Sequence, residues 1–267
     1  MPIADVRAFN RAIVDATKDL VCAYKPNIAF YEALGLEGLA ALRDTTAYIR
    51  KTAPDAVLLA DAKRGDIDST SVKYAEAMFD YWGFDAVTVN GYMGGESLSP
   101  FFNYSDRGVF VVCRSSNPGA REFQDIIVSP DAQELGMDGS GQKMPLYEWM
   151  AVRSSKWNAN GNLGLVVGAT SPEQLRIVRE HCPGVPILIP GVGAQGGELE
   201  ASVKNGMDCS DDGMCKSPNI LINSSRGIIY ADRSADGFAD GARMLQHDCV
   251  MTSTACWRRR ARRGNAV

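Results

Sequence analysis

Several features are scarce in this sequence of 267 residues, and each scarcity excludes a class of protein. No run of 18 or more apolar residues occurs, so we expect no transmembrane helix and no membrane partner. The first 20 residues carry charges throughout and have no apolar central segment, so we expect no secretory signal. Basic residues are not in excess, because the net charge is −4. This balance argues against a nucleic-acid partner.

Histidine and paired cysteine are also scarce. Both histidines lie at the ends of predicted helical segments, which argues against a histidine catalyst. The seven cysteines form no C-x-x-C pair, and Cys209 and Cys215 flank an acidic loop without a nearby histidine, so no zinc site is predicted. Cys22 and Cys113 lie in apolar runs and are predicted to be buried. This cysteine usage suits a reducing compartment and predicts a cytoplasmic protein.

Seven short apolar runs alternate along the chain with segments long enough to form helices. Such alternation predicts a parallel sheet with helices on its faces, and continuously apolar runs are typical of strands buried on both faces. The segment Val6–Thr17 has helical periodicity, so no eighth strand is predicted before the first run. The predicted strands are Leu20–Tyr24, Val57–Ala60, Ala86–Val89, Val109–Cys113, Leu163–Val167, Pro186–Ile189 and Ile220–Ile222.

The chain contains no Gly/Ser linker, so we expect a single α/β domain over residues 1–267, a length that suits a (β/α)₈ barrel. Two polar stretches, Ser129–Met144 and Asp208–Pro218, are predicted to be surface loops. Residues 258–263 read RRRARR, and we expect residues 250–267 to form an irregular basic tail. An electrostatic tether to an acidic partner is the alternative function of this tail.

Charged residues directly follow the second predicted strand, where residues 61–70 read DAKRGDIDST. Asp61 and Lys63 are two residues apart, so on an extended strand they share one face. Asp66 lies at the mouth of the following helix, and Lys25 follows the neighbouring strand, close to Asp61. In a buried Asp–Lys–Asp array, two carboxylates keep the ammonium charged and the lysine can deliver a proton. A structural ion pair is the alternative, although three charges at the end of an apolar strand are costly without a purpose.

Glycines and an arginine follow the last two predicted strands. Residues 190–197 read PGVGAQGG before a predicted helix, where backbone N–H groups can approach an anion. Arg226 follows the final strand and can bind phosphate through two N–H groups. The loops after the last two strands of a (β/α)₈ barrel often bind phosphate, so the pair predicts a phosphate site. Ser116 and Asn117, after the fourth predicted strand, either bind a polar ring edge or form only a turn.

Together these motifs resemble the orotidine 5′-phosphate decarboxylase family, in particular its longer bacterial (type 2) subfamily, over about residues 9–231. DAKRGDIDST fits the family's D-x-K-x-x-D-I-x-x-T pattern at every defined position, and KPNIAFYEALG, SSNPGA, PGVGAQGG and INSSR occur in the expected order. The resemblance implies a phosphate-binding (β/α)₈ TIM barrel. It also implies conversion of orotidine 5′-monophosphate to uridine 5′-monophosphate (UMP) and CO₂ in pyrimidine synthesis, without metal or cofactor, by a homodimer with shared sites.

The resemblance also assigns roles to residues of this sequence. Lys63 would donate a proton to C6, Asp61 would lie beside the departing carboxylate, and Lys25 would hold Asp61 and the ribose. The remaining assignments are Asp66 and Thr70 reaching into the partner's site, Ser116 binding the pyrimidine, Gln195 and Arg226 binding the phosphate, Val192 and Gly193 in a closing lid, and Ile67, Pro190 and Ser225 in the substrate site.

One feature of that family has no counterpart near the start of this sequence. The family begins with a strand that closes the barrel and ends in a ribose-binding aspartate, and nothing before Leu20 resembles it. Asp5 and Asp15 lie beside or within the helical pattern and are not substitutes. We therefore expect a barrel with seven recognisable strands and unpaired edges at Leu20–Tyr24 and Ile220–Ile222.

Two other functions stay open at this point. One is a magnesium-dependent decarboxylase or aldolase of the same phosphate-binding barrel superfamily, for which Glu32 is the only nearby candidate ligand. The other is a ligand-binding protein that is inactive because it lacks the first strand. The Ser-Asn-Pro-Gly and glycine-rich segments favour the pyrimidine substrate.

Overall fold

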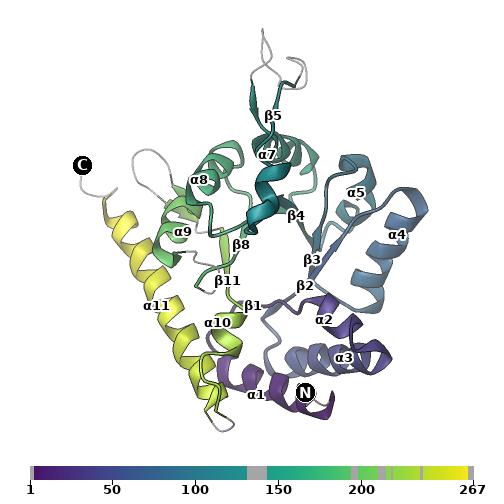
Figure 1. Cartoon of the computed structure of the whole chain (residues 1–267), viewed down its shortest axis with the longest axis vertical. Coiled ribbons are helices and arrows are strands. Elements are labelled where there is room, and N and C mark those ends of the chain that lie inside the picture. Colours follow the sequence, from purple (N-terminus) through teal and green to yellow (C-terminus); the bar gives the residue numbers. More distant parts are fainter. Residues whose placement is uncertain are drawn as a thin grey trace.

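A curled sheet of seven parallel strands lies at the centre of the molecule (Figure 1). The computed structural model describes residues 3–130, 143–193, 198–209, 215–217, 219–234 and 237–263. Each strand of the sheet pairs in parallel with its neighbours, as the alternation of strands and helices predicts. In spatial order the strands are β1 (Ala23–Tyr24), β2 (Val57–Arg64), β3 (Ala86–Val89), β4 (Gly108–Arg114), β7 (Leu163–Val167), β8 (Ile187–Pro190) and β11 (Ile220–Asn223).

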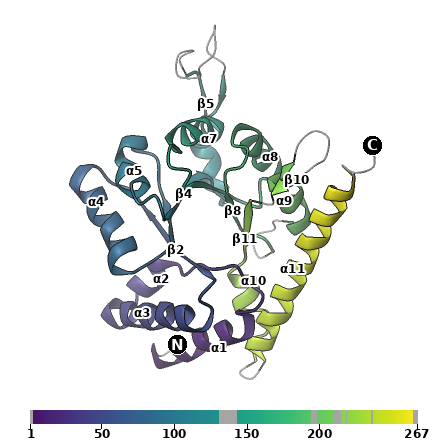
Figure 2. The ribbon, with the colours of Figure 1, turned by 180° about the vertical axis from the view of Figure 1, so that it is seen from behind.

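Helices surround the outer side of this sheet, as the two opposite views show (Figures 1 and 2). The first, α1, confirms the helix predicted before the first strand. The helices are α1 (Ile3–Thr17), α2 (Ile28–Glu32), α3 (Gly35–Thr52), α4 (Asp68–Glu76) with a π-helical turn (Ala77–Tyr81), α5 (Gly95–Phe102), a 3₁₀ turn (Pro118–Glu122), α7 (Leu146–Trp157), α8 (Pro172–His181), α9 (Leu199–Gly206), α10 (Arg226–Ile229) and α11 (Phe238–Arg263). None of the helices in the described part of the chain combines the length and apolar character needed to cross a membrane.

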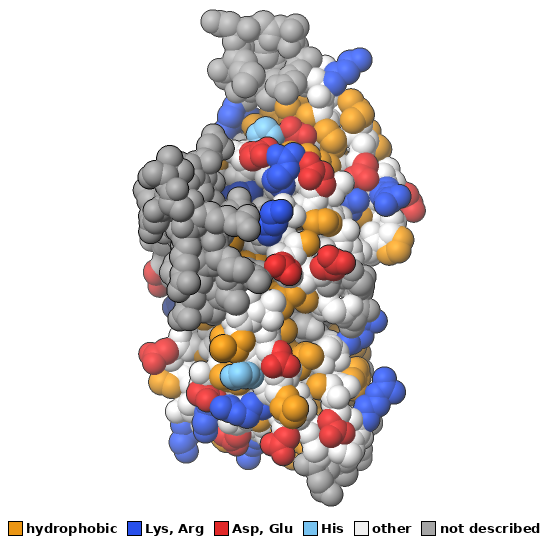
Figure 3. Space-filling view, turned by 90° about the vertical axis from the view of Figure 1, so that its left-hand side faces the viewer, with side chains coloured by type: hydrophobic (Ala, Val, Ile, Leu, Met, Phe, Trp, Pro, Cys, Tyr) orange, Lys and Arg blue, Asp and Glu red, His pale blue; other side chains and the backbone are white. Residues whose placement is uncertain are grey.

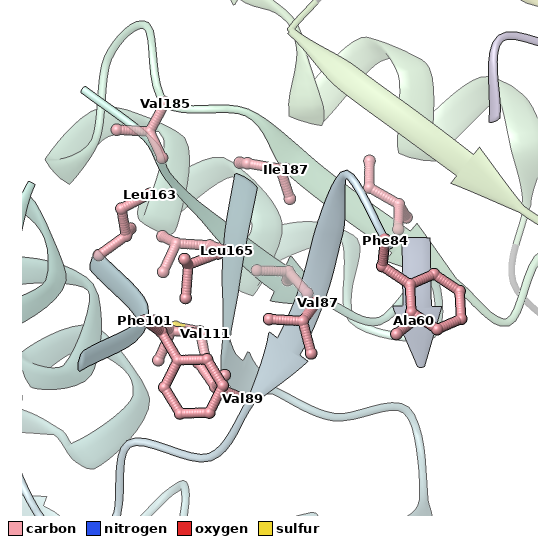
Figure 4. Close-up of a cluster of buried hydrophobic side chains, with 14 of the residues drawn as sticks. Ala60, Phe84, Val87, Val89, Phe101, Val111, Leu163, Leu165, Val185 and Ile187 are labelled. Atoms are coloured by element: carbon pink, nitrogen blue, oxygen red, sulfur yellow. The ribbon is translucent and has the colours of Figure 1, made fainter. Parts of the chain in front are cut away.

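Side chains alternate along each strand between two apolar layers, because successive residues of a strand point to opposite faces. The outer layer packs between sheet and helices and includes Val87, Val111 and Leu165 (Figure 4). The inner layer fills the curled sheet with Leu59, Ala86, Phe110, Val166 and Leu188. Both faces of the sheet are therefore buried, as the continuously apolar strands predict.

The sheet does not close between its first and last strands. In the described structure, β1 pairs only with β2, and β11 pairs only with β8. A cavity of about 660 Å³ lies between these two edges, against α1 and α11. The two predicted unpaired edges are confirmed, although β1 is shorter than the run Leu20–Tyr24.

Three local expectations are corrected by the structure. The basic segment predicted to be irregular continues α11 as far as Arg263, because alanine and arginine favour helices and cations are favourable near a helix C-terminus. The second predicted loop carries a short antiparallel pair, β9 (Asp208–Cys209) with β10 (Cys215–Ser217). The pair of β5 (Ile127–Val128) with β6 (Met144–Pro145) flanks the first predicted loop, of which residues 131–142 lie outside the described residues. Cys113 is buried as predicted, but Cys22 is exposed because it lies at the open edge of the sheet.

Candidate active site

The inward-facing side chains change from apolar to polar at the carboxyl ends of the strands. Asp61, Thr88 and Asn223 each lie two positions after an inward-facing apolar residue of the same strand. Because the carboxyl ends of parallel strands meet at one edge, these polar groups come together there. They line a cavity of about 270 Å³ together with Lys25, Asn27, Lys63, Ser115, Ser116, Pro190, Gly191, Val192, Ser224, Ser225 and Arg226.

The carboxylate of Asp61 lies between two lysines on the wall of this cavity. Lys25 Nζ lies 2.5 Å from Asp61 Oδ2, and Lys63 Nζ donates to Asp61 Oδ1. The side chains of Lys25 and Asp61 are 9% and 11% exposed, whereas that of Lys63 is 54% exposed. This confirms the expected proximity of Lys25 to Asp61, and it leaves the Lys63 ammonium accessible from solvent.

Charge and burial act in opposite directions on these groups. Burial by itself would raise the pKa of Asp61, but the adjacent Lys25 and Lys63 ammonium groups outweigh it and hold that pKa below its ordinary value. Burial lowers the pKa of Lys25, and the charge of Asp61 opposes that shift. Asp61 is therefore a carboxylate at neutral pH, held in place by hydrogen bonds from cations.

A bulge in β2 brings Lys63 to the cavity. Ala60 lies opposite Val87 and Arg64 lies opposite Val89, so three residues of β2 face Thr88 alone. Lys63 has a φ of +47°, in the left-handed region that residues other than glycine rarely adopt. Asp61 and Lys63 do meet as predicted, but through this irregular backbone and not through the simple alternation of a regular strand.

Asp66 does not accompany Lys63 within the chain. None of the contacts among the described residues joins these two side chains, and Asp66 Oδ1 accepts from the backbone N–H of Ile67 at 2.8 Å. Ile67 and Thr70 are exposed, and neither they nor Asp66 line the described cavity. Gly65, directly before Asp66, passes so close to the Asn90 carbonyl that a Cβ would lie 2.6 Å from it. The predicted buried Asp–Lys–Asp array is therefore a Lys–Asp–Lys array in one chain.

The predicted phosphate-binding segments lie side by side at this cavity. Ser224 Oγ donates to Val192 O at 3.2 Å and so joins the loop after β8 to the end of β11. The side chain of Arg226 is exposed and takes part in none of the ion pairs of the described structure. Gly193, with a φ of +77°, is the last described residue of its loop, and Gln195 lies outside the described residues.

A network of hydrogen bonds holds the loop that carries Ser116. Gln124 Oε1 accepts from Ser115 N at 2.8 Å, and Gln124 Nε2 donates to Ser115 Oγ at 2.9 Å. The buried Arg114 donates to Ser115 O at 2.9 Å and forms an ion pair with Asp125 at 3.0 Å. These contacts keep Ser116 at the cavity, as the sequence predicts.

Sequence reasoning missed several residues of this site, above all Asn27, Thr88 and Asn223. Alternation provides a signal for Thr88 and Asn223, since each is the last inward-facing residue of its strand. Glu32, the candidate magnesium ligand, forms an ion pair with Arg64 and does not line the described cavity. Among the described residues, no group of three or more His, Cys, Asp or Glu side chains is placed to hold a metal ion.

Comparisons with known proteins give relatives for both sequence and fold. The model of the "Orotidine 5'-phosphate decarboxylase / HUMPS family" matches residues 4–236. A protein of Thermomicrobium roseum named orotidine 5'-phosphate decarboxylase is 51% identical over 236 residues, which are 88% of this chain and 76% of that protein.

Two solved structures from Leishmania donovani are similar to the whole described fold. The structure of an OMP decarboxylase has a TM-score of 0.76 and 36% identity, and covers 95% of this chain and 90% of its own. The structure of a UMP synthase has a TM-score of 0.80 and 37% identity, and covers 96% of this chain but 51% of its own.

Proposed function

Since the chain belongs to the orotidine 5′-phosphate decarboxylase / HUMPS family, we propose that it is a carboxy-lyase that converts orotidine 5′-monophosphate to UMP and CO₂. The observation that carries this proposal is the Asp61 carboxylate held between Lys25 and Lys63 on a cavity that Arg226 also lines. The cavity thus offers a fixed anion, a proton-bearing cation and a separate cation for a phosphate.

In the proposed reaction, the bond between C6 and the carboxylate breaks and CO₂ leaves. The electron pair stays at C6, where Lys63 stabilises the charge and then donates a proton. Asp61 lies beside the departing carboxylate, so that like-charge repulsion is relieved as neutral CO₂ forms. Lys25 keeps Asp61 ionised and contacts the ribose. The contacts of Asp61 with both lysines support these roles.

The remaining cavity residues would bind the rest of the substrate. We propose that Ser116 binds the pyrimidine and that Arg226 and Gln195 bind the phosphate, with Val192 and Gly193 in a loop that closes over it. Pro190 and Ser225 would complete the wall. The hydrogen bond between Ser224 and Val192 supports this arrangement, because it brings the glycine-rich loop next to Arg226. Remote phosphate contacts can lower the barrier by ordering the site.

A homodimer with shared sites is also part of the proposal, in which Asp66, Ile67 and Thr70 reach the partner's cavity. Large apolar side chains are exposed just after the carboxyl ends of three neighbouring strands, with exposed fractions of 75% for Phe30, 53% for Ile67 and 83% for Tyr92. Exposed apolar groups gathered near one edge of a sheet are typical of interaction surfaces.

We propose a cytoplasmic protein that binds neither nucleic acid nor membranes. On the visible face of Figure 3, acidic and basic side chains are interspersed, whereas nucleic-acid-binding proteins gather basic side chains in a stripe or patch. Cys22, Cys113, Cys182 and Cys249 are free thiols, which suits a reducing compartment.

A turnover assay on orotidine 5′-monophosphate tests the proposed reaction. We expect UMP and CO₂ in equal amounts, and the rate should not change with EDTA, because protein side chains supply the proton and the charges. A rate that EDTA abolishes would favour the magnesium-dependent alternative. Binding of UMP without any release of CO₂ from the substrate would favour the non-catalytic alternative.

A further inference from the structure

The hydroxyl of Thr88 connects β3 to the irregular segment of β2. Its side chain points inward, two positions after Ala86, and is 1% exposed. Thr88 Oγ1 accepts from Ala62 N at 3.1 Å and from Lys63 N at 3.0 Å, and donates to Asp61 Oδ1 at 3.2 Å. A hydroxyl has one hydrogen and two lone pairs, so these three contacts use its full capacity. The carbonyl of Ala60, at 3.5 Å, is the more distant alternative acceptor.

The bulge needs such a partner for two reasons. Where three residues of β2 face one residue of β3, the regular ladder of backbone hydrogen bonds is interrupted, and N–H groups that are partly shielded from water are costly without an acceptor. Lys63 also has a left-handed φ, which persists only where the surroundings determine the backbone. The Thr88 hydroxyl supplies the acceptor for both freed N–H groups.

We propose that Thr88 is a positioning residue for proton transfer, which holds the β2 bulge so that Lys63 Nζ and the Asp61 carboxylate meet at the same point of the cavity. This positioning role rests on the role proposed for Lys63, but the hydrogen bonds between Thr88 and the bulge are a property of the protein without substrate. Thr88 forms no described contact with the loops after β8 and β11. Loss of the hydroxyl should therefore slow the chemical step and leave phosphate binding unchanged.

Two substitutions separate the hydroxyl from the shape of the side chain. Thr88→Val keeps the volume and removes the hydroxyl, whereas Thr88→Ser keeps the hydroxyl. We expect Thr88→Val to lower kcat roughly 100-fold, because a misplacement of about 1 Å can have this effect, with little change in KM. Thr88→Ser should stay near the parent. Thr46→Val is the matched control, since Thr46 is a buried threonine on α3 that donates to Arg43 O.

A kcat for Thr88→Val equal to that of the parent would overturn the proposal. So would a kcat for Thr88→Ser as low as that of Thr88→Val, because packing and not the hydroxyl would then matter.

Amide hydrogen exchange, followed by NMR, tests whether the Thr88 hydroxyl supports the β2 bulge, without any assay of activity. The amides of Ala62 and Lys63 should be protected in the unaltered chain and in Thr88→Ser, and exchange faster in Thr88→Val. If Thr88→Val does not fold, the unaltered chain and Thr88→Ser still test the proposal. Exchange of the Ala62 and Lys63 amides at the rate of exposed loops in these two proteins would refute the support of the bulge by Thr88. If the parent does not decarboxylate the substrate, the proposed function fails while protected amides still support the positioning by Thr88.

Discussion

The charge state of Asp61 is set by its two nearest side chains. Its carboxylate is 11% exposed, a position in which an isolated charge would be unfavourable, and it stays ionised because Lys25 and Lys63 both contact it. Lys25 is buried with it, whereas Lys63 faces solvent. One lysine is therefore placed to hold the carboxylate, and the other is free to approach a bound molecule.

Replacement of the proposed proton donor should abolish turnover. We expect Lys63→Ala to lower kcat more than the roughly 10²–10⁴-fold typical of a general acid, because Lys63 also stabilises the charge at C6. The measurement is UMP formation, with circular dichroism to confirm the fold. Lys73→Ala is the control, since Lys73 is exposed on α4 and pairs with Glu76. Residual activity within about tenfold of the parent would contradict the role.

Replacement of Arg226 should mainly weaken phosphate binding. A charge-assisted contact contributes about 1.5–3 kcal/mol, so Arg226→Ala should lower kcat/KM by roughly 10- to 100-fold. The exposed Arg233, which lies over the Tyr230 ring, offers the control Arg233→Ala. An equal loss on the nucleoside substrate that lacks the phosphate would show that Arg226 does not bind the phosphate.

Asp61 should also make stability depend on pH. Its pKa in the folded chain lies below its ordinary value of 3.8, so its stabilising effect is complete above pH 3.8 and is lost as the pH falls through the folded pKa. Asp61→Asn leaves Lys25 buried without its anion and should cost about 3 kcal/mol at pH 7. Urea unfolding of parent and variant should show this difference shrinking below pH 3.8.

The exposed Asp106 provides the control for that experiment. Asp106→Asn removes a carboxylate that is 75% exposed and should change stability little at any pH. A difference between the parent and Asp61→Asn that stays constant from neutral to acid pH would mean that the pKa of Asp61 is not lowered by folding.

At the scale of elements, an apolar cavity separates β1 from β11, the two ends of the sheet. The cavity of about 660 Å³ is lined by Leu59 and Leu188 on the inner side, and by Ile13 and Val203 on the helix side. Both sides are apolar, as they are around a strand buried on both faces. The backbone groups of β1 and β11 along the gap have no strand partner in the described structure.

An added N-terminal strand should therefore raise both the soluble yield and the kcat/KM of the protein. We expect an N-terminal apolar strand that ends in an aspartate to raise soluble yield, because it covers two strand edges. It should also raise kcat/KM by roughly 10- to 100-fold, because a charged partner for substrate hydroxyls contributes about 1.5–3 kcal/mol. An extension of equal length made of glycine and serine is the control. If the 267-residue chain is a well-behaved dimer with the same kcat/KM, the strand is dispensable.

At the scale of the whole molecule, the position of Asp66 and Thr70 bears on assembly. Both lie outside the described cavity of their own chain, and Ile67, which lies between them in the sequence, is exposed. Asp66 is half-buried and Thr70 is exposed. In a homodimer with shared sites they would complete the partner's cavity, and one site would then depend on residues of two chains.

Mixing two inactive variants tests this sharing. Lys63→Ala and Asp66→Ala proteins should each be inactive, and subunit exchange should restore activity, because one site of the mixed dimer carries both lesions and the other carries none. The measurement is UMP formation after exchange has been verified with differently tagged chains. Lys63→Ala mixed with itself is the control. No recovery in a verified mixed dimer would show that each site is built from one chain.

Much of the fold could be predicted from local patterns. The alternation of seven apolar runs with helical segments determined the order and number of the strands in the parallel sheet, since these periodicities depend on neighbouring residues only. The meeting of Lys25, Asp61, Ser116 and Arg226 at one cavity also followed, because all four lie at or shortly after the carboxyl ends of the predicted strands, and parallel strands end at one edge.

Only the tertiary structure decided the features that depend on contacts between distant segments. The left-handed backbone of Lys63 and its support by Thr88 arise from the pairing of β2 with β3, which no local pattern reports. Asp66 lies outside the described cavity after Gly65 passes the Asn90 carbonyl, and Cys22 is exposed because the sheet stays open beside β1. The sequence by itself thus determined which groups come to the cavity, while packing between strands decided their backbone conformation and the orientation of their side chains.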